Sequence, residues 1–364
     1  MKIEDLTYEQ CVVQGIGPLV FPKRLAQPLS GSLLKEGEES QLRAQMKAVC
    51  VQNMQMQTKM QRVLEQAWKA LEDAGIHAVL MKGWGLAQYY PSPEQRQWGD
   101  IDIYVGPEQY HAACAAMRSV WPEVPKFDEE LEHYKHYNLI ADGVSIELHR
   151  VTMVLNHPKD AKRYARMERE GMSATELLNE RPTDSMSVTK SLNDVQYRVP
   201  ETTYNALYVF LHSWEHMIGY SANLRQLCDL AFLLHHEKGK IDKVRLKRWL
   251  KELKLTEVWQ LYMYIAVHSI GLPEDEAPLY NPSEEIRERS EKLLNERFMG
   301  NGERLKWRGE KPTNRWARKI YTMRKRWWIA EQIARYNPSY ARHMKAAVLL
   351  KGLRRMFAKD RRWE

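Results

Sequence analysis

Apolar positions early in the chain follow the period of a helix. From about Glu39 to Ala74 they recur every three or four residues, and Gly75 stands where a helix commonly ends. The pattern predicts one long helix over these residues. Before it, glycines and prolines in residues 1–38 interrupt any long element, so an irregular segment is expected there.

Shorter patterns with a strand period follow. Residues 77–81 form an apolar, strand-like run, 83–90 suit one or two helical turns, and 100–105 alternate polar and apolar residues. Pro107 then opens a predicted helix that continues to about Val120. Strand, turn, strand and helix in this order predict a small mixed sheet.

A hairpin completes the predicted sheet. The strand-like runs 136–141 and 144–149 flank Asp142-Gly143, a favoured two-residue hairpin loop. We therefore expect an α/β domain over residues 39–150.

The pattern changes after this point. A charged helix is predicted over Pro158–Arg181, and wide apolar stripes at helical spacing fill most of 201–298. The predicted fold class is α+β. A small mixed-sheet domain is followed by a mainly α-helical domain over 151–302 and a helical extension over 303–364.

Composition and the distribution of apolar residues and cysteines exclude several classes of protein. The chain has 364 residues, 44% of them hydrophobic, which is enough for a core. No window approaches the ~18 apolar residues of a membrane span. The N-terminus has Glu4 and Asp5 and no apolar stretch of a signal peptide, so a cytoplasmic protein is expected. Four scattered cysteines indicate neither a disulfide framework nor a structural zinc site.

Positive charge is concentrated in the predicted extension. From Glu303 onward there are 19 Lys and Arg against 5 Asp and Glu, whereas the whole chain has a net charge of +8. Five of the twelve tryptophans lie there too: Trp307, Trp316, Trp327, Trp328 and Trp363. This mixture suits contact with a polyanion, either nucleic acid or an anionic membrane surface. Apolar positions such as Val348 and Leu349 equally suit a helix face that packs on the body.

Carboxylates at alternating strand positions are the most informative residues. Asp100 and Asp102 share one face of a predicted strand, because residues two apart point the same way. Glu147 and His149 repeat this spacing, so Glu147 becomes a third ligand if the hairpin lies alongside. Carboxylate oxygens suit Mg²⁺ or Mn²⁺, which relieve the repulsion between them. The alternative is that Asp-x-Asp marks the solvated face of the strand.

Three segments resemble a known family. LMKGWGLAQYYPSPEQRQWGDIDIYV, VSIELHR and NLRQLCDLAFLL resemble, in this order, motifs of bacterial nucleotidyltransferase-like proteins. These proteins are a poorly characterised branch of the polymerase-β superfamily, with a Lys-Gly turn and a Gly-Asp-Ile-Asp motif. The resemblance covers roughly Glu39 to Gly271.

The resemblance implies a metal-dependent nucleotidyltransferase. Asp100, Asp102 and Glu147 would be the catalytic carboxylates and would hold Mg²⁺ or Mn²⁺. The co-substrate would be a nucleoside triphosphate such as ATP, and an acceptor hydroxyl would receive the nucleoside monophosphate group. The acceptor could be a small molecule, a protein, a glycan or an RNA. An inert nucleotide- or metal-binding interaction module, antitoxin-like or a partner protein, is the main alternative.

Further residues are assigned to the nucleotide by the same resemblance. Gly83 would let the backbone approach the phosphates, and Lys82 or Arg96 would neutralise them. The superfamily usually has Gly-Ser or Gly-Gly at this turn, whereas this chain has Gly83-Trp84. Phosphate binding must then come from backbone amides or from Lys82.

A pair of residues and a short motif on predicted helices each allow more than one interpretation. Arg225 and Asp229 suit a local ion pair four residues apart. The resemblance raises the alternative that they face the cleft between domains and steady the nucleotide site or the acceptor. The segment from His212 through Glu215 to His216 matches the inverted zinc-peptidase motif H-x-x-E-H, a remote alternative function.

Overall fold

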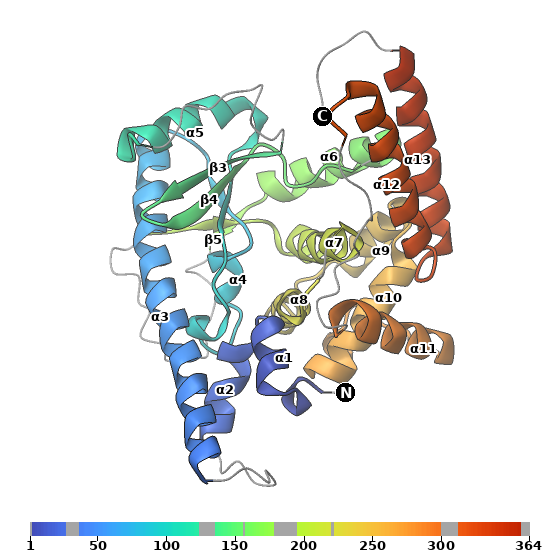
Figure 1. Ribbon diagram of the computed structural model, residues 1–364. Helices are drawn as coiled ribbons and strands as arrows, with labels where there is room; N and C mark the ends of the chain where they lie inside the picture. The colour runs from blue at the N-terminus through green and yellow to red at the C-terminus, as the bar shows by residue number, and fades with distance from the viewer. Residues whose placement is uncertain are drawn as a thin grey trace.

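The structure, a computed structural model, describes residues 2–26, 36–123, 135–155, 157–177, 195–219, 222–299 and 312–357. Within these ranges a small mixed sheet packs with many helices, so the protein is of the α+β class (Figure 1). No helix in the described part of the chain combines the length and apolarity needed to cross a membrane.

Short helices occupy residues 2–26 of the N-terminal segment that was expected to be irregular, and residues 27–35 lie outside the described ranges. They are η1 (Ile3–Asp5), α1 (Tyr8–Val13) and α2 (Gly17–Leu25). Thr7 caps α1 by accepting a hydrogen bond from the Gln10 N–H at 3.2 Å. Pro18 stands in the first turn of α2, where its missing N–H costs no helical bond. The proline therefore starts a helix here instead of preventing one.

The predicted long helix is confirmed as α3 (Glu36–Asp73). Gly75 follows it with φ +70°, and the Ile76 N–H donates to the Leu71 carbonyl at 2.9 Å, which is a common helix ending. α3 packs against α5 (Gly106–Val120), the helix opened by Pro107, and both lie beside the sheet (Figure 1).

The sheet has four strands in the order β1 (Val79–Leu80), β2 (Ile101–Tyr104), β4 (Val144–His149) and β3 (His136–Ala141). β2 is antiparallel to β1 and parallel to β4, and β3 and β4 form the predicted hairpin. Asp142 and Gly143 in its loop both have positive φ, as such a loop requires. Between β1 and β2 lie the turns α4 (Trp84–Ala87) and η2 (Pro93–Gln95).

Both faces of β2 are buried, although its alternation predicted a half-buried strand. Ile101 and Ile103 belong to the core that includes α3 and α5 residues. Asp102 points to the other face and is only 4% exposed. The helical part of the chain lies against that face (Figure 1), so the carboxylate is in the interior and needs polar partners.

Helices form most of the remaining described chain. They are α6 (Pro158–Ser173), α7 (Thr202–Gly219), α8 (Leu224–His236), α9 (Lys243–Glu252), α10 (Thr256–Ile265), η4 (Ala266–Ile270), η5 (Glu274–Glu276), α11 (Glu284–Leu293) and η6 (Leu294–Phe298). A two-stranded ribbon of β5 (Glu176–Leu177) and β6 (Arg198–Val199) lies between α6 and α7 in the chain. α6 ends at Ser173, earlier than predicted, and residues 178–181 lie outside the described ranges.

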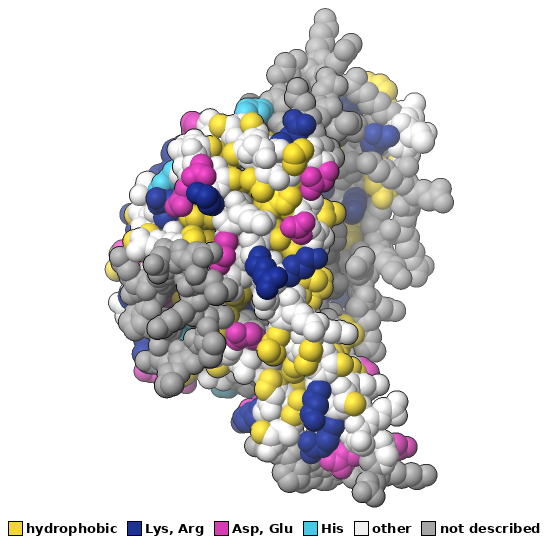
Figure 2. Space-filling model, turned by 90° about the vertical axis from the view of Figure 1, so that its left-hand side faces the viewer, with side chains coloured by type: hydrophobic (Ala, Val, Ile, Leu, Met, Phe, Trp, Pro, Cys, Tyr) yellow, Lys and Arg dark blue, Asp and Glu magenta, His cyan; other side chains and the backbone are white. Residues whose placement is uncertain are grey.

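The C-terminal extension is a helical hairpin of α12 (Arg315–Ile333) and α13 (Pro338–Phe357). Of the apolar positions expected to pack on the body, Val348 is buried and Leu349 is 51% exposed. Ala330, Tyr336 and Met344 are buried as well, whereas Trp316 is 59% exposed. The side of the molecule on which α3 lies, at the left of Figure 1, shows Lys and Arg interspersed with Asp, Glu and hydrophobic residues (Figure 2). Trp307 and Trp363 lie outside the described residues, and polyanion contact by the extension stays a prediction.

Candidate active site

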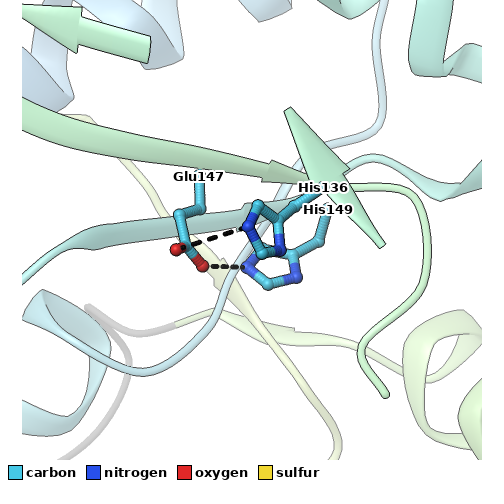
Figure 3. A group of neighbouring side chains, drawn as sticks. All are labelled: His136, Glu147 and His149. Carbon is cyan, nitrogen blue, oxygen red and sulfur yellow. Dashed lines mark hydrogen bonds and ion pairs between the residues drawn. The ribbon is translucent and has the colours of Figure 1, made fainter. Parts of the chain in front are cut away.

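Two carboxylates and two imidazoles meet on β2, β4 and β3. The parallel ladder pairs Asp102 with Glu147, and the hairpin pairs His136 with His149. His149 Nε2 lies 3.0 Å from Asp102 Oδ1 and 3.1 Å from Glu147 Oε2. His136 Nε2 lies 3.6 Å from Glu147 Oε1 (Figure 3). The His149 ring therefore lies between the two carboxylates, and ligand atoms of His136, Glu147 and His149 all lie within 4.8 Å of one another.

The turn after β1 reaches the same place. Lys82 Nζ lies 2.8 Å from Asp102 Oδ1, and both side chains are largely buried. Gly83 has φ +54°, and a Cβ at this position would stand 2.4 Å from the carbonyl oxygen of Asp100. A side chain is excluded twice, by the backbone conformation and by this contact. Glycine thus lets the turn approach the start of β2 closely.

Neighbouring groups favour the ionised form of the buried Asp102 and the partly buried Glu147. Burial raises the pKa of Asp102, but the charge of Lys82 and a hydrogen bond with His149 outweigh it and hold this pKa well below its usual range. Burial also opposes ionisation of Glu147, yet the hydrogen bond with His149 and the charge of Lys82 lower its pKa. Both residues of the ladder pair are therefore negatively charged at neutral pH.

Asp100 lies one residue before β2 and is exposed. Partial burial of its carboxyl group and the negative charges of Asp102 and Glu147 raise its pKa. Such repulsion is what a divalent cation relieves, and three carboxylates suit a hard cation. The donor set therefore fits the metal that the resemblance implies. Asp102 and Glu147 lie at the centre of the group, and Asp100 lies at its solvent-facing rim.

A buried ion pair holds the segment that leads to Asp100. Arg96 binds Asp229 of α8 through two parallel contacts, Nε to Oδ1 at 2.8 Å and Nη2 to Oδ2 at 2.9 Å. Tyr90 donates its hydroxyl to the same Asp229 Oδ1 at 2.8 Å. On the other side, Asn53 and Gln57 of α3 both donate to the Arg96 carbonyl at 2.9 Å. Arg96 thus connects α3 and α8 with its guanidinium committed to Asp229.

Arg225 binds the next residues of the same segment. Its Nη1 donates to the Trp98 carbonyl at 2.9 Å and to the Gln97 carbonyl at 3.3 Å. Asp229 therefore pairs with Arg96, and Arg225 binds the backbone of the residues that follow Arg96. The local ion pair between Arg225 and Asp229 is thus not the arrangement that these contacts give, and support of a nucleotide site by the two residues stays a prediction.

The H-x-x-E-H motif lies on α7, near Lys82. Glu215 pairs with Lys135 at 3.5 Å, and the His212 and His216 rings meet edge to face with centroids 4.5 Å apart. Burial and then the charge of Lys82 lower the pKa of both histidines. Two groups of three potential metal ligands occur among the described residues, and neither contains these histidines. The zinc-peptidase hypothesis gains no support from this geometry.

Patterns in the sequence point to three residues that were not assigned to the site from the sequence: His136, Asn53 and Gln57. Counting back from the two-residue loop pairs His136 with His149, so the place of His136 could have been derived. Asn53 and Gln57 stand four residues apart and interrupt the apolar stripe of the long helix. Polar residues in such a stripe indicate buried hydrogen-bond partners.

Comparison with known proteins gives the family. A family model described as an uncharacterised nucleotidyltransferase matches residues 5–271, more than half of the chain, so the chain belongs to this family. Searches of curated proteins and of solved structures gave no match. The matched region begins ahead of α1 and ends before α11, so α1 and α2 lie inside it and the basic extension lies beyond it.

Proposed function

We propose that this member of the family is a metal-dependent enzyme that moves a nucleoside monophosphate group from a nucleoside triphosphate onto an acceptor hydroxyl. The acceptor oxygen bonds to the α-phosphorus, the bond from this phosphorus to the β-phosphate oxygen breaks, and pyrophosphate leaves. The hydroxyl proton passes to water. The observation that carries the proposal is the pairing of Asp102 with Glu147 across adjacent parallel strands, beside Asp100 and the glycine turn.

Asp100, Asp102 and Glu147 are the residues that would hold the cations, Mg²⁺ or Mn²⁺. When bound, such ions offset the charge of the triphosphate and lower the pKa of the attacking hydroxyl. The protein's own contribution is to keep two of the carboxylates ionised through Lys82 and His149. Because the nearby imidazoles favour a transition metal over Mg²⁺, we expect Mn²⁺ to support activity at least as well.

Lys82 and Gly83 are assigned to the triphosphate. Lys82 brings an ammonium group to the turn, where its side chain is 11% exposed, and the bare Gly83 leaves the backbone approachable. We assign Arg96, Arg225 and Asp229 a positioning role, because their side chains hold one another or the backbone at residues 97 and 98. This assignment replaces the direct phosphate contact expected of Arg96 from the sequence.

Transfer of label tests the proposal. The purified protein is incubated with cell extract, Mg²⁺ or Mn²⁺, and each nucleoside triphosphate labelled at the α- or the γ-phosphate. We expect α-label, and no γ-label, to enter one fraction of the extract, and the Asp100→Ala/Asp102→Ala variant to transfer neither. The labelled fraction then identifies the acceptor class. Transfer of γ-label would indicate phosphoryl transfer, and equal labelling by the variant would exclude this site.

An inert nucleotide- or metal-binding interaction module is the second candidate. It is supported by the fact that Asp102 Oδ1 already has partners within the chain, Lys82 and His149. This alternative predicts that nucleotide binds and that no fraction of the extract becomes labelled. The same assay therefore separates the two functions.

A further inference from the structure

A second group of histidines and a carboxylate lies where α6 meets α13. Asp160 Oδ2 contacts His343 Nε2 and lies 4.0 Å from His157 Nδ1. The two imidazole rings have centroids 3.9 Å apart. A cavity of about 600 Å³ opens beside these rings.

The lining of this cavity is basic. Besides Pro158 and Leu350, it consists of His157, Lys159, Arg163, Lys254 and His343, which we call the basic pocket. These five residues come from the start of α6, the turn after α9, and α13. Residues far apart in the sequence thus bring the positive charges of Lys159, Arg163 and Lys254 to one concave place, where Asp160 pairs with Arg163. Like charges gathered in this way attract an anion.

The backbone at Lys254 gives independent support. Lys254 follows α9 with φ +59°, a left-handed conformation that glycine normally provides at a helix end. The Leu255 N–H donates to the Leu250 carbonyl at 2.9 Å, and Asn337 Nδ2 donates to the Lys254 carbonyl at 3.0 Å, so the strained conformation is fixed on both sides. Strained residues cluster at binding sites. The strained position here carries an ammonium group 3.3 Å from His343 Nδ1.

Charge decides which ligand suits the pocket. His157, Asp160 and His343 are close enough to share a metal ion. However, Arg163 Nη1 already lies 3.1 Å from Asp160 Oδ1, and His157 Nδ1 already accepts a hydrogen bond from the Lys159 N–H at 3.3 Å. A divalent cation would meet the charges of the two lysines and the arginine, whereas an anion would be attracted by them.

We propose that the basic pocket is a second ligand site, which binds the phosphate group of a phosphorylated small molecule. Phosphate is the anion that Lys, Arg and His donors commonly bind. A cavity of about 600 Å³ has room for an organic part as well, because it falls within the size range of small-molecule sites. The site uses none of the carboxylates of the sheet and goes beyond nucleotidyl transfer.

Lys254→Gly is the decisive variant. Glycine relieves the backbone strain, so the variant should fold and melt at least as high as wild type, while losing the ammonium group. We expect full-length wild-type protein at low salt to bind inorganic phosphate and glycerol 3-phosphate, but not glycerol, in titration calorimetry. Lys254→Gly should bind both phosphates at least about tenfold more weakly, the ratio expected for loss of one charge-assisted hydrogen bond of about 1.5 kcal/mol. Lys251→Ala, an exposed lysine of α9 outside the pocket, should match wild type.

Other results would overturn the proposal. Equal phosphate affinity of wild type and Lys254→Gly, or no binding of either phosphate, would show that the pocket is no phosphate site. Loss of phosphate binding in Asp102→Asn with retention in Lys254→Gly would place the ligand at the sheet. Stoichiometric Zn²⁺ that is lost in His343→Ala would make the pocket a metal site. Tighter binding of a 5′-phosphorylated oligonucleotide than of glycerol 3-phosphate would contradict a small-molecule ligand.

Discussion

Two regions of the molecule combine two histidines with a carboxylate, and their surroundings differ in charge. The sheet cluster consists of His136, Glu147 and His149. Further carboxylates, Asp100 and Asp102, lie beside it. The basic pocket combines His157 and His343 with Asp160 beneath them, and its other lining charges are lysine and arginine.

The comparison shows that the types of ligand residue do not by themselves decide what binds. Both groups place three potential metal ligands within 4.8 Å. Beside the sheet cluster, partial burial raises the pKa of Asp100, and the negative charges of Asp102 and Glu147 raise it further. In the pocket, burial lowers the pKa of His157, and the positive charges of neighbouring residues lower it further. We infer that the first region suits a cation and the second an anion.

The largest expected effect is on catalysis. Asp102→Asn should lower nucleotidyl transfer by at least about 100-fold, because it removes a buried charge at the centre of the site. Transfer of α-label measures this loss, and a thermal melt shows whether the variant is folded. His111→Asn, at an exposed position of α5, serves as the control and should transfer at the wild-type rate. A folded Asp102→Asn protein with full activity would remove this residue from the mechanism.

The buried ion pair predicts a large effect on stability. Arg96→Met leaves the carboxylate of Asp229 buried with Tyr90 as its remaining side-chain hydrogen-bond donor, so the free energy of unfolding should fall by about 3–5 kcal/mol. Urea denaturation measures it. Arg96→Met/Asp229→Leu should recover most of the loss, because it removes both charges. A double variant no more stable than the single one would argue against the ion pair as the cause.

Gly75 and Gly83 both have positive φ, but only Gly83 has a backbone atom close to the position of a Cβ. Substitution of each by alanine therefore measures the cost of backbone strain with and without a steric collision. Gly75→Ala meets open space at φ +70° and should cost about 1–2 kcal/mol of stability through backbone strain. Gly83→Ala should cost more and weaken nucleotide binding, because its Cβ would collide with the carbonyl of Asp100. Denaturation and nucleotide titration of the two variants test this difference. Equal costs would mean that the turn does not need its close approach to β2.

A smaller effect is expected from pH. The fold holds the pKa of His212 well below its usual value, so the unfolded chain takes up a proton near pH ~6.5 while the folded chain does not. Stability should therefore decrease as the pH falls from about 7.5 through 6.5. His212→Asn should reduce this decrease in urea midpoints, whereas His111→Asn should not. A pH dependence unchanged by His212→Asn would assign the effect to other groups.

The sequence predicted local elements better than contacts between distant segments. The long helix and the hairpin follow from periodicity and turn residues, and both are confirmed. The strand predicted over 100–105 is present as Ile101–Tyr104, which includes Asp102 and leaves Asp100 just before it. The pairing of Arg96 with Asp229 joins positions 133 residues apart. No local pattern predicts it, whereas Arg225 and Asp229 stand at the spacing of a helical pair.

Contacts between distant segments also limited what the sequence could predict about the sheet carboxylates and the basic pocket. Pairing of Asp102 with Glu147 could be expected if the hairpin lay beside the first carboxylate strand, and the structure has that arrangement. Burial of β2 on both faces depends on where the helices that follow the hairpin pack, which alternation within the strand does not encode. The basic pocket likewise needs α13 to return to α6, so charge counts alone predicted only a basic extension.

Binding of Mn²⁺ tests most directly the central claim that Asp100, Asp102 and Glu147 hold the metal and the basic pocket does not. Electron paramagnetic resonance of free Mn²⁺, titrated with full-length protein and a nucleoside triphosphate, gives the number and affinity of bound ions after subtraction of a nucleotide-only control. We expect the Asp100→Asn/Glu147→Gln variant to lose protein-dependent binding and the His157→Asn/His343→Asn variant to keep it. Binding that persists in the first variant and disappears in the second would contradict the account.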